Sequence, residues 1–190
     1  MTNTKKTGKL KLFFLMLILT AVSVIIIYSS VSIAVQTVYP KQYIELIDTT
    51  ADDFEIDRAL LYALIKTESG FDNEAVSTVG AKGLTQITPE TFDWLQTKTG
   101  ENRDEDDLFD PEISVYYGAF FLDMLLDEFG NTETALAAYH AGRGKVNEWL
   151  ADPRISPDGK TLENIPYDDT ASYVEKVIKT CEKYRRIYDM

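Results

Sequence analysis

The chain has 190 residues, of which 45% are hydrophobic and 12% aromatic, and its formal net charge is −12. This length fits one domain, or one domain plus an appendage, and the apolar content excludes wholesale disorder. With a single Cys and a single His, the chain cannot form an internal disulfide framework or an all-Cys/His zinc site. The net acidity argues against binding of nucleic acid, which requires clustered Lys and Arg.

The first 35 residues form a segment of their own. Lysines at positions 5, 6, 9 and 11 are the only charged residues before position 41, so residues 12–35 are uncharged and mostly apolar. About 20 apolar residues are enough for a helix to cross a bilayer. The pattern predicts a cytoplasmic basic tail over residues 1–11 and a transmembrane signal-anchor over residues 12–35. A cleaved secretory signal is the alternative, although its apolar region is usually only about 7–15 residues long.

Both interpretations export the remaining residues, 36–190. This part holds all 31 acidic residues and all but four of the 19 basic ones, which gives it a net charge of −16. Such a domain is expected to be soluble and to avoid anionic lipid head groups.

Residues 36–190 are predicted to be helical. Thr88-Pro89 and Asp110-Pro111 each pair an N-cap residue with Pro at the first helical position, and Asp57 is a further N-cap candidate. Gly70 and Gly130 are candidate left-handed stops. The expected helices cover residues 40–52, 58–69, 89 onward, 111–129, 133–141, 145–150 and 170–188, the last with Cys181 on its apolar face as a small core residue.

Three stretches lack a helical pattern. Residues 97–107 are polar and mostly charged, and residues 151–166 contain three prolines, so both are predicted to be loops. Residues 71–87 connect two helices, and a short hairpin within them stays an open alternative.

Glu68 stands out on its predicted helix. At about 100° per residue it shares the apolar stripe of Leu61, Leu64 and Ile65, and it lies in the last turn, where the helix dipole disfavours a negative charge. Burial and the dipole both raise the pKa of a carboxyl group, and an acid that is protonated near neutral pH can cleave a glycosidic bond. A terminal Glu that leans into solvent past Gly70 is the alternative.

No second catalytic carboxyl is evident. Most glycosidases use two carboxyl groups. The nearest acids in the sequence, Asp72, Glu74 and Glu90, lack the apolar setting of Glu68 and are predicted to be surface or loop residues.

Five blocks of sequence carry a resemblance to a known family. They read ESGF with AVS, GAKGLTQ, LFDP, AAYHAG, and IPY with YV, at residues 68–71 with 75–77, 80–86, 108–111, 137–142, and 165–167 with 173–174. In this order they resemble the soluble-type (SLT) lytic transglycosylases, exported bacterial enzymes of the lysozyme-like superfamily that cleave peptidoglycan. The resemblance covers roughly residues 54–178 and implies an all-α, lysozyme-like (goose-type/SLT) catalytic domain over residues 36–190.

The resemblance also implies a mechanism. Glu68 would be the only catalytic acid/base, protonating the oxygen between N-acetylmuramic acid and N-acetylglucosamine. It would then accept the proton of the muramoyl C6 hydroxyl, which attacks the anomeric carbon and leaves a 1,6-anhydro end. This internal nucleophile removes the need for a second carboxylate, and no metal or organic cofactor is implied. The substrate-binding positions implied are Ser77, Gly83, Thr85, Gln86, Tyr139, His140 and Tyr173.

Some of these positions have a second interpretation. Tyr139 and Tyr173 can pack in the core while presenting a hydroxyl to the cleft. Gly80 and Gly83 are expected to permit close approach of the backbone to the sugar.

This chain departs from the family pattern at four positions. Thr85, His140, Arg143 and Asp169 stand where Met, Asn, Pro and often Glu are usual. Thr85 is expected to make the cleft wall smaller and more polar. His140, with an unperturbed pKa of about 6.5, would link activity to mild acidification, and a substrate contact and a structural role for it stay equally open.

The sequence therefore predicts a membrane-anchored peptidoglycan lytic transglycosylase. The alternatives are a lysozyme-type muramidase on the same fold, with water replacing the C6 hydroxyl, and a non-catalytic peptidoglycan-binding or assembly protein. The expected partners are peptidoglycan glycan strands and, through the N-terminal helix, the membrane, with no nucleic acid. The expected location is the cell membrane, single-pass with the domain extracytoplasmic, or outside the cell after signal cleavage.

Overall fold

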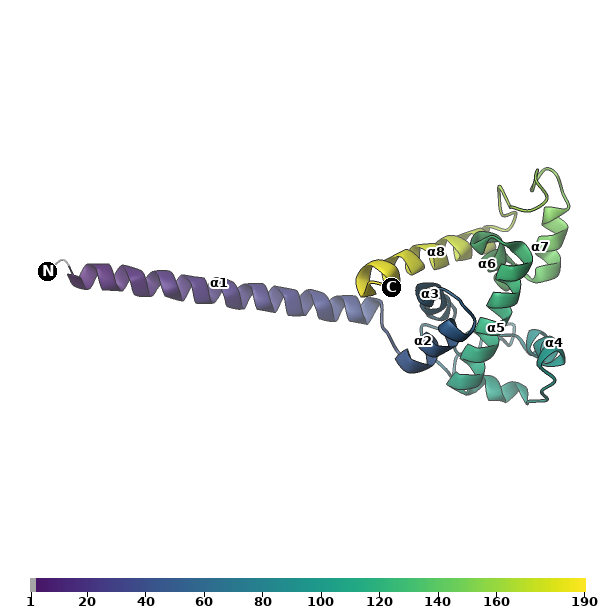
Figure 1. Cartoon of the computed structure of the whole chain (residues 1–190), viewed down its shortest axis with the longest axis horizontal. Helices are drawn as coiled ribbons and strands as arrows, with labels where there is room; N and C mark the ends of the chain where they lie inside the picture. Colours follow the sequence, from purple (N-terminus) through teal and green to yellow (C-terminus); the bar gives the residue numbers. More distant parts are fainter. Residues whose placement is uncertain (1–2) are drawn as a thin grey trace. The chain divides into compact units, whose positions relative to one another are not determined.

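The computed structural model describes the backbone of residues 3–190 and the side chains from residue 12 onward. Within this range the chain is helical and contains no strand (Figure 1). The prediction of an all-α fold is confirmed. The helices are α1 (Asn3–Val38), α2 (Ile44–Asp53), α3 (Arg58–Glu68), α4 (Pro89–Thr99), the 3-10 helix η1 (Glu105–Phe109), α5 (Pro111–Phe129), α6 (Thr132–Ala141), α7 (Arg143–Leu150) and α8 (Asp168–Tyr188).

The chain divides into two compact units, Met1–Lys41 and Gln42–Met190. The first unit contains α1, in which Leu12–Val38 has a mean hydropathy of 2.6 and no buried residue. This segment is long and apolar enough to cross a membrane, and it extends three residues beyond the predicted span 12–35. Of the predicted tail 1–11, the backbone from Asn3 is helical, whereas Met1, Thr2 and all the side chains lie outside the described part of the chain.

In the second unit, α3 is the central helix. It packs against α8 and α2, while α5 packs against α6 and α2, and Figure 1 shows α8 next to α3. Every residue of α3 from Ala59 to Ile65 is buried, because the helix is covered from several sides. Cys181 of α8 is 3% exposed and belongs to this core, as predicted, and burial raises the pKa of its thiol to about 11.

Asp57, predicted to be an N-cap residue, caps the start of α3 in the structure. The Asp57 carboxylate accepts hydrogen bonds from the backbone N–H groups of Ala59 and Leu60, at 2.8 and 3.3 Å. The same carboxylate pairs with Arg185 of α8 at 2.5 Å, so one residue starts α3 and ties it to α8. At the other end of α3, Ser69 is the C-cap residue and directly follows Glu68, the last residue of the helix.

The predicted loop over residues 97–107 is partly wrong. Helix α4 continues to Thr99, and η1 begins at Glu105. The Asp104 carboxylate caps η1 by accepting from the N–H of Asp106 at 2.9 Å, and Lys82 pairs with Glu105 at 2.9 Å and with Asp106 at 2.6 Å. The turn is thus stabilised by a cation distant in sequence, which local polarity does not reveal.

Other helix starts also differ from prediction, and α6 and α8 begin one and two residues earlier than predicted, at Thr132 and Asp168. Helix α2 begins at Ile44 rather than residue 40, after Tyr43 with a φ of 52°. Helix α7 begins at Arg143 rather than residue 145, because a single residue, Gly142 with a φ of 92°, separates it from α6. Residues 151–166 contain no helix, as predicted.

The segment between α3 and α4 forms no regular hairpin. It contains two isolated antiparallel bridges, Val76 with Lys82 and Lys82 with Ile87. The Ser77 N–H donates to the Ala81 carbonyl at 2.9 Å, and the Gly83 N–H donates to the Ala75 carbonyl at 3.0 Å. The segment is therefore a compact folded loop that starts next to Glu68.

Candidate active site

Glu68 is the last residue of α3 and is partly buried. Its Oε1 atom accepts a hydrogen bond of 2.6 Å from the hydroxyl of Tyr173, which lies on α8. Burial raises the pKa of Glu68 to about 7, although the hydrogen bond from Tyr173 and the charge of Lys176 both act to lower it. A substantial fraction of this carboxyl group is therefore protonated at neutral pH, which is the state a general acid requires.

A second tyrosine, Tyr139 of α6, is part of the same environment. Its hydroxyl donates to the Thr85 carbonyl at 2.8 Å, and its ring lies 5.1 Å from that of Phe121. Burial, and after it the charge of Glu68, raise the pKa of both Tyr139 and Tyr173 well above the ordinary value. Both hydroxyls therefore stay protonated, and each can donate a hydrogen bond.

The loop after α3 is attached to the helix end by Ser69, which caps α3. The Ser69 hydroxyl donates to the Leu84 carbonyl at 2.9 Å and accepts from the Phe71 N–H at 3.2 Å. Phe71 is buried and has a φ of 71°, a strained conformation for a non-glycine residue. This role of Ser69 was not predicted from the sequence. The signal that could have indicated it is the position of Ser69 between Glu68 and the predicted stop at Gly70.

Ser77 and Gln86 stabilise the interior of this loop. The Ser77 hydroxyl accepts from the Ala81 N–H at 3.0 Å. The Gln86 side-chain amide donates to the carbonyls of Ala75 and Gly83, at 3.0 and 2.9 Å. Both side chains are partly exposed, so each combines a structural bond with surface that a ligand can reach.

Gly83 is buried where the loop meets η1. A Cβ atom added there would lie 1.9 Å from the Leu108 carbonyl oxygen and 2.8 Å from the Ser114 hydroxyl, and its φ is +74°. The close approach that Gly83 permits is therefore to the protein's own backbone. This packing fixes the position of the loop relative to the start of α5.

The side chain of Thr85 lies in the core and not on a cleft wall. It is fully buried, its hydroxyl donates to the Ser114 carbonyl at 2.7 Å, and it contacts Gly118 so closely that a Cβ there would lie 2.4 Å from it. The expected smaller, more polar cleft wall is thus not formed by this side chain. Only the backbone carbonyl of Thr85 reaches the site, through Tyr139.

His140 contacts Glu68 indirectly, through Tyr173. Its ring stacks on that of Tyr173, with 4.4 Å between centroids and 27° between planes, and its Nδ1 atom lies 3.1 Å from the Thr170 hydroxyl. Desolvation lowers the pKa of His140, and the charge of Asp169 opposes this effect. The stacking places His140 against the ring whose hydroxyl is bonded to Glu68. Thr170 was not predicted as a site residue, and the start of α8 gave no sequence signal for it.

A cavity of about 430 Å³ lies beside Tyr139 and His140. The indole of Trp94 and the ring of Phe121, 6.1 Å apart and nearly perpendicular, form part of its wall. The lining residues are Thr88, Glu90, Thr91, Trp94, Phe121, Tyr139, His140, Ala141, Gly142 and Arg143. Of the three acids considered as partners of Glu68, Glu90 lines this cavity, whereas Asp72 and Glu74 are exposed residues of the loop.

Comparison with known proteins identifies relatives of the helical domain. Residues 45–161 match the family described as Transglycosylase SLT domain. The chain is 30% identical over 151 residues to a soluble lytic murein transglycosylase of Salmonella typhimurium, covering 77% of the chain and 23% of that protein. It is 28% identical over 170 residues to a membrane-bound lytic murein transglycosylase C of Glaesserella parasuis, covering 77% of the chain and 47% of that protein.

A solved structure agrees with these matches. The chain superposes with a TM-score of 0.70 on the lytic transglycosylase Slt of Pseudomonas aeruginosa, at 30% identity, covering 80% of the chain and 25% of that protein. The structure is that of a Glu-to-Gln variant described as inactive. The chain thus spans about a quarter of the length of several of the relatives that it matches.

Proposed function

The chain belongs to the Transglycosylase SLT domain family, and on this premise we propose that it is a peptidoglycan lytic transglycosylase that uses Glu68 as its single catalytic acid and base. The observation that carries the proposal is the carboxyl group of Glu68, whose pKa is raised to about 7 by burial and whose Oε1 atom is bonded to Tyr173. A Glu-to-Gln variant of the Pseudomonas relative is described as inactive, which fits an essential role for a glutamate.

In the first step, protonated Glu68 donates its proton to the oxygen that joins N-acetylmuramic acid to N-acetylglucosamine. The bond between this oxygen and the muramoyl anomeric carbon breaks, and the N-acetylglucosamine portion leaves as an alcohol. The carboxylate that remains on Glu68 is stabilised by the hydrogen bond from Tyr173, which is stronger to an anion than to a neutral acid.

In the second step, the Glu68 carboxylate accepts the proton of the muramoyl C6 hydroxyl. The C6 oxygen forms a bond to the anomeric carbon, which closes the 1,6-anhydro ring and returns Glu68 to its protonated form. The substrate supplies the nucleophile, so no second carboxylate is required, unlike in the two-carboxyl glycosidases.

The sugar rings would bind along the surface that joins Glu68 to the 430 Å³ cavity. We assign the direct contacts to Ser77, Gln86, Tyr139, His140 and Tyr173, with Trp94 as an apolar face for a sugar ring. Gly83 and Thr85 would contribute through backbone position, since both are buried.

The location proposed is the membrane, with α1 as a single-pass anchor. The apolar segment Leu12–Val38 and the similarity to a membrane-bound relative support this assignment. The lysines before the segment favour a cytoplasmic N-terminus and an extracytoplasmic catalytic domain. Tethering would raise the local concentration of the domain near the cell wall.

The test is digestion of purified peptidoglycan by the full chain in a non-ionic detergent, followed by mass identification of the glycan ends. We expect 1,6-anhydro-muramoyl ends with the natural chain and none with Glu68→Gln. Reducing ends would instead indicate a hydrolase, and full activity of Glu68→Gln would refute the catalytic assignment. Absence of any product, with the fold intact, would indicate a binding protein.

A further inference from the structure

A second cavity, none of whose lining residues is Glu68, lies between α2, residues 101–103 and the first turns of α5. We propose that it is a second binding site, which takes a peptide bearing a lysine-type primary ammonium group. Its volume is about 750 Å³, within the range of sites for small organic ligands. It is lined by Tyr43, Ile44, Glu45, Leu46, Thr49, Thr50, Asp53, Glu101, Arg103, Glu112, Ile113, Tyr116 and Tyr117.

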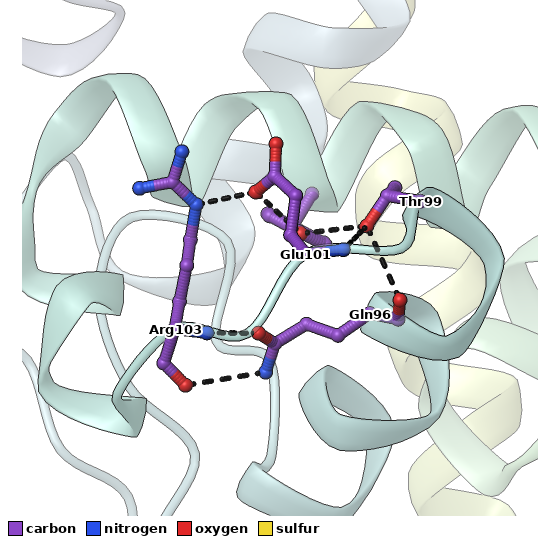
Figure 2. Close-up of polar contacts among 5 residues, drawn as sticks. Gln96, Thr99, Glu101 and Arg103 are labelled. Carbon is purple, nitrogen blue, oxygen red and sulfur yellow. Dashed lines mark hydrogen bonds and ion pairs between the residues drawn. The ribbon is translucent and has the colours of Figure 1, made fainter.

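One wall of this ammonium pocket is held rigidly by a polar network. Figure 2 shows Gln96 at the end of α4 bonded to the backbone of Arg103, while the Arg103 guanidinium pairs with Glu101. The Tyr117 hydroxyl donates to Glu101 at 3.0 Å and lies 3.1 Å from the Thr99 hydroxyl. Residues 101–103 are thus attached to both α4 and α5, so the wall exists before any ligand binds.

The network also determines which charges face a ligand. Among the lining residues that the structure describes, Arg103 is the only cation, and it is paired with Glu101, whose pKa it holds below the ordinary value. The other lining carboxylates, Glu45, Asp53 and Glu112, form no ion pair among residues 12–190. The pocket therefore has an excess of negative charge, which attracts a cation and repels an anion.

The apolar part of the pocket selects the type of cation. Ile44 is 52% exposed and Tyr116 39% exposed, so both side chains present apolar surface to a ligand in the pocket. The Tyr116 ring is held by Phe54, Tyr117 and Phe120 at centroid distances of 5.5, 5.2 and 6.3 Å. A fixed aromatic face next to carboxylates suits an ammonium group on an alkyl chain, because the face attracts the charge and Ile44 covers the methylenes.

A lysine side chain within a peptide has this combination of groups. A neutral sugar would gain nothing from the excess charge, and a phosphate or carboxylate ligand would be repelled by it. The site does not share lining residues with the cavity beside Tyr139 and His140, so its ligand can bind whether or not that cavity is occupied.

The test is an NMR titration of the full chain, labelled with ¹⁵N-tyrosine, in a non-ionic polyoxyethylene detergent. The probe is the blocked tripeptide acetyl-Ala-Lys-Ala-amide at millimolar concentration, and the comparison peptide carries Nε-acetyl-lysine. Single Tyr→Phe variants assign the signals of Tyr43, Tyr116 and Tyr117, and those of Tyr139 and Tyr173 report on the catalytic cleft. We expect saturable shifts at the first three signals with the lysine peptide only, weakened by salt.

Variants establish which groups are responsible. Glu45→Gln combined with Glu112→Gln is expected to weaken binding about threefold to tenfold, and Tyr116→Leu about twofold to fivefold. Glu163→Gln, an exposed acid outside the pocket, is the matched control and should leave binding unchanged. Thermal unfolding checks that each variant is folded.

Three results would overturn the proposal. They are no saturable shift with the lysine peptide, equal shifts with the acetylated peptide, and equal binding by the folded double variant. Shifts at the same tyrosines with a neutral N-acetylglucosamine oligomer, but not with the lysine peptide, would assign the cavity to sugar instead. None of these readouts depends on cleavage of peptidoglycan.

Discussion

Removing the hydroxyl of Tyr173 should make Glu68 a weaker acid. In Tyr173→Phe the ring is retained, so its stacking with His140 at 4.4 Å can persist while the 2.6 Å hydrogen bond to Glu68 is lost. This bond stabilises the carboxylate more than the neutral acid and at present lowers the pKa of Glu68 against the effect of burial. Its loss therefore raises the pKa.

The size of the shift follows from the energy of the bond. A hydrogen bond to a charged group contributes roughly 1.5–3 kcal/mol, and one pKa unit corresponds to about 1.4 kcal/mol. Part of the bond also exists with the neutral acid, so we expect a rise of about one unit from the present value of about 7. A general acid loses activity as it ionises, so the alkaline limb of the pH–rate profile should move about one unit higher.

The assay is release of anhydro-muramoyl ends measured across the pH range by mass spectrometry. Tyr139→Phe is the matched control, because its hydroxyl is bonded to the Thr85 carbonyl and not to Glu68. Its alkaline limb should stay in place even if its rate falls. An alkaline limb of Tyr173→Phe that stays in place, or moves to lower pH, would refute the reasoning.

Three further predictions concern stability and pH. Burial raises the pKa of Glu68 from 4.5 to about 7, so the folded state holds this proton more tightly and stability falls as pH rises between these values. Glu68→Gln should remove this decline and stabilise the chain by about 2–3 kcal/mol at pH 8. Urea unfolding of both chains at about pH 4.5 and at pH 8 measures the effect, and an unchanged pH dependence of the stability would contradict the prediction. Gly83→Ala should destabilise the chain by at least ~2 kcal/mol, because its Cβ would meet the Leu108 carbonyl at 1.9 Å. Gly80→Ala is the control, because Gly80 has a φ of +80° but no atom lies within 4 Å of an added Cβ, and it should destabilise the chain by only about 1 kcal/mol. Thermal unfolding measures both variants, and equal losses of stability would count against a packing role for Gly83. Protonation of the His140 ring places a cation against Tyr173, at a pH set by a pKa that lies below the ordinary value. Because His140→Asn removes this titrating group, the acid limb of the pH–rate profile should disappear in the variant. A profile identical to that of the natural chain would exclude His140 as its cause.

Helix starts and stops were predictable because their signals are local. Asp57, Thr88 and Asp110 cap α3, α4 and α5 through side chains that bond to N–H groups two or three residues later. Gly130 ends α5 with a φ of 61°, as a residue without Cβ can do readily. Such signals need no knowledge of the rest of the fold, which is why these boundaries agree with the structure.

The parts that were not predicted depend on contacts between distant residues. Helix η1 is fixed by Lys82, which comes from the preceding loop. The bond between Tyr173 and Glu68 joins residues 105 positions apart, and the family resemblance implied a substrate-binding role for Tyr173 without indicating its bond to Glu68. The ammonium pocket combines α2, residues 101–103 and α5, none of which has a distinctive motif.

The two departures at Thr85 and His140 differ in what they can change. Thr85 meets Tyr139 through its backbone carbonyl, a group that every residue possesses, while its side chain packs against Ser114 and Gly118 in the core. Its identity therefore affects packing between the loop and α5 more than the chemistry of the site. His140 contacts Tyr173 through its ring, and this ring changes charge on protonation. Since Tyr173 donates the hydrogen bond to Glu68, His140 is the departure through which this chain can differ from its relatives in pH response.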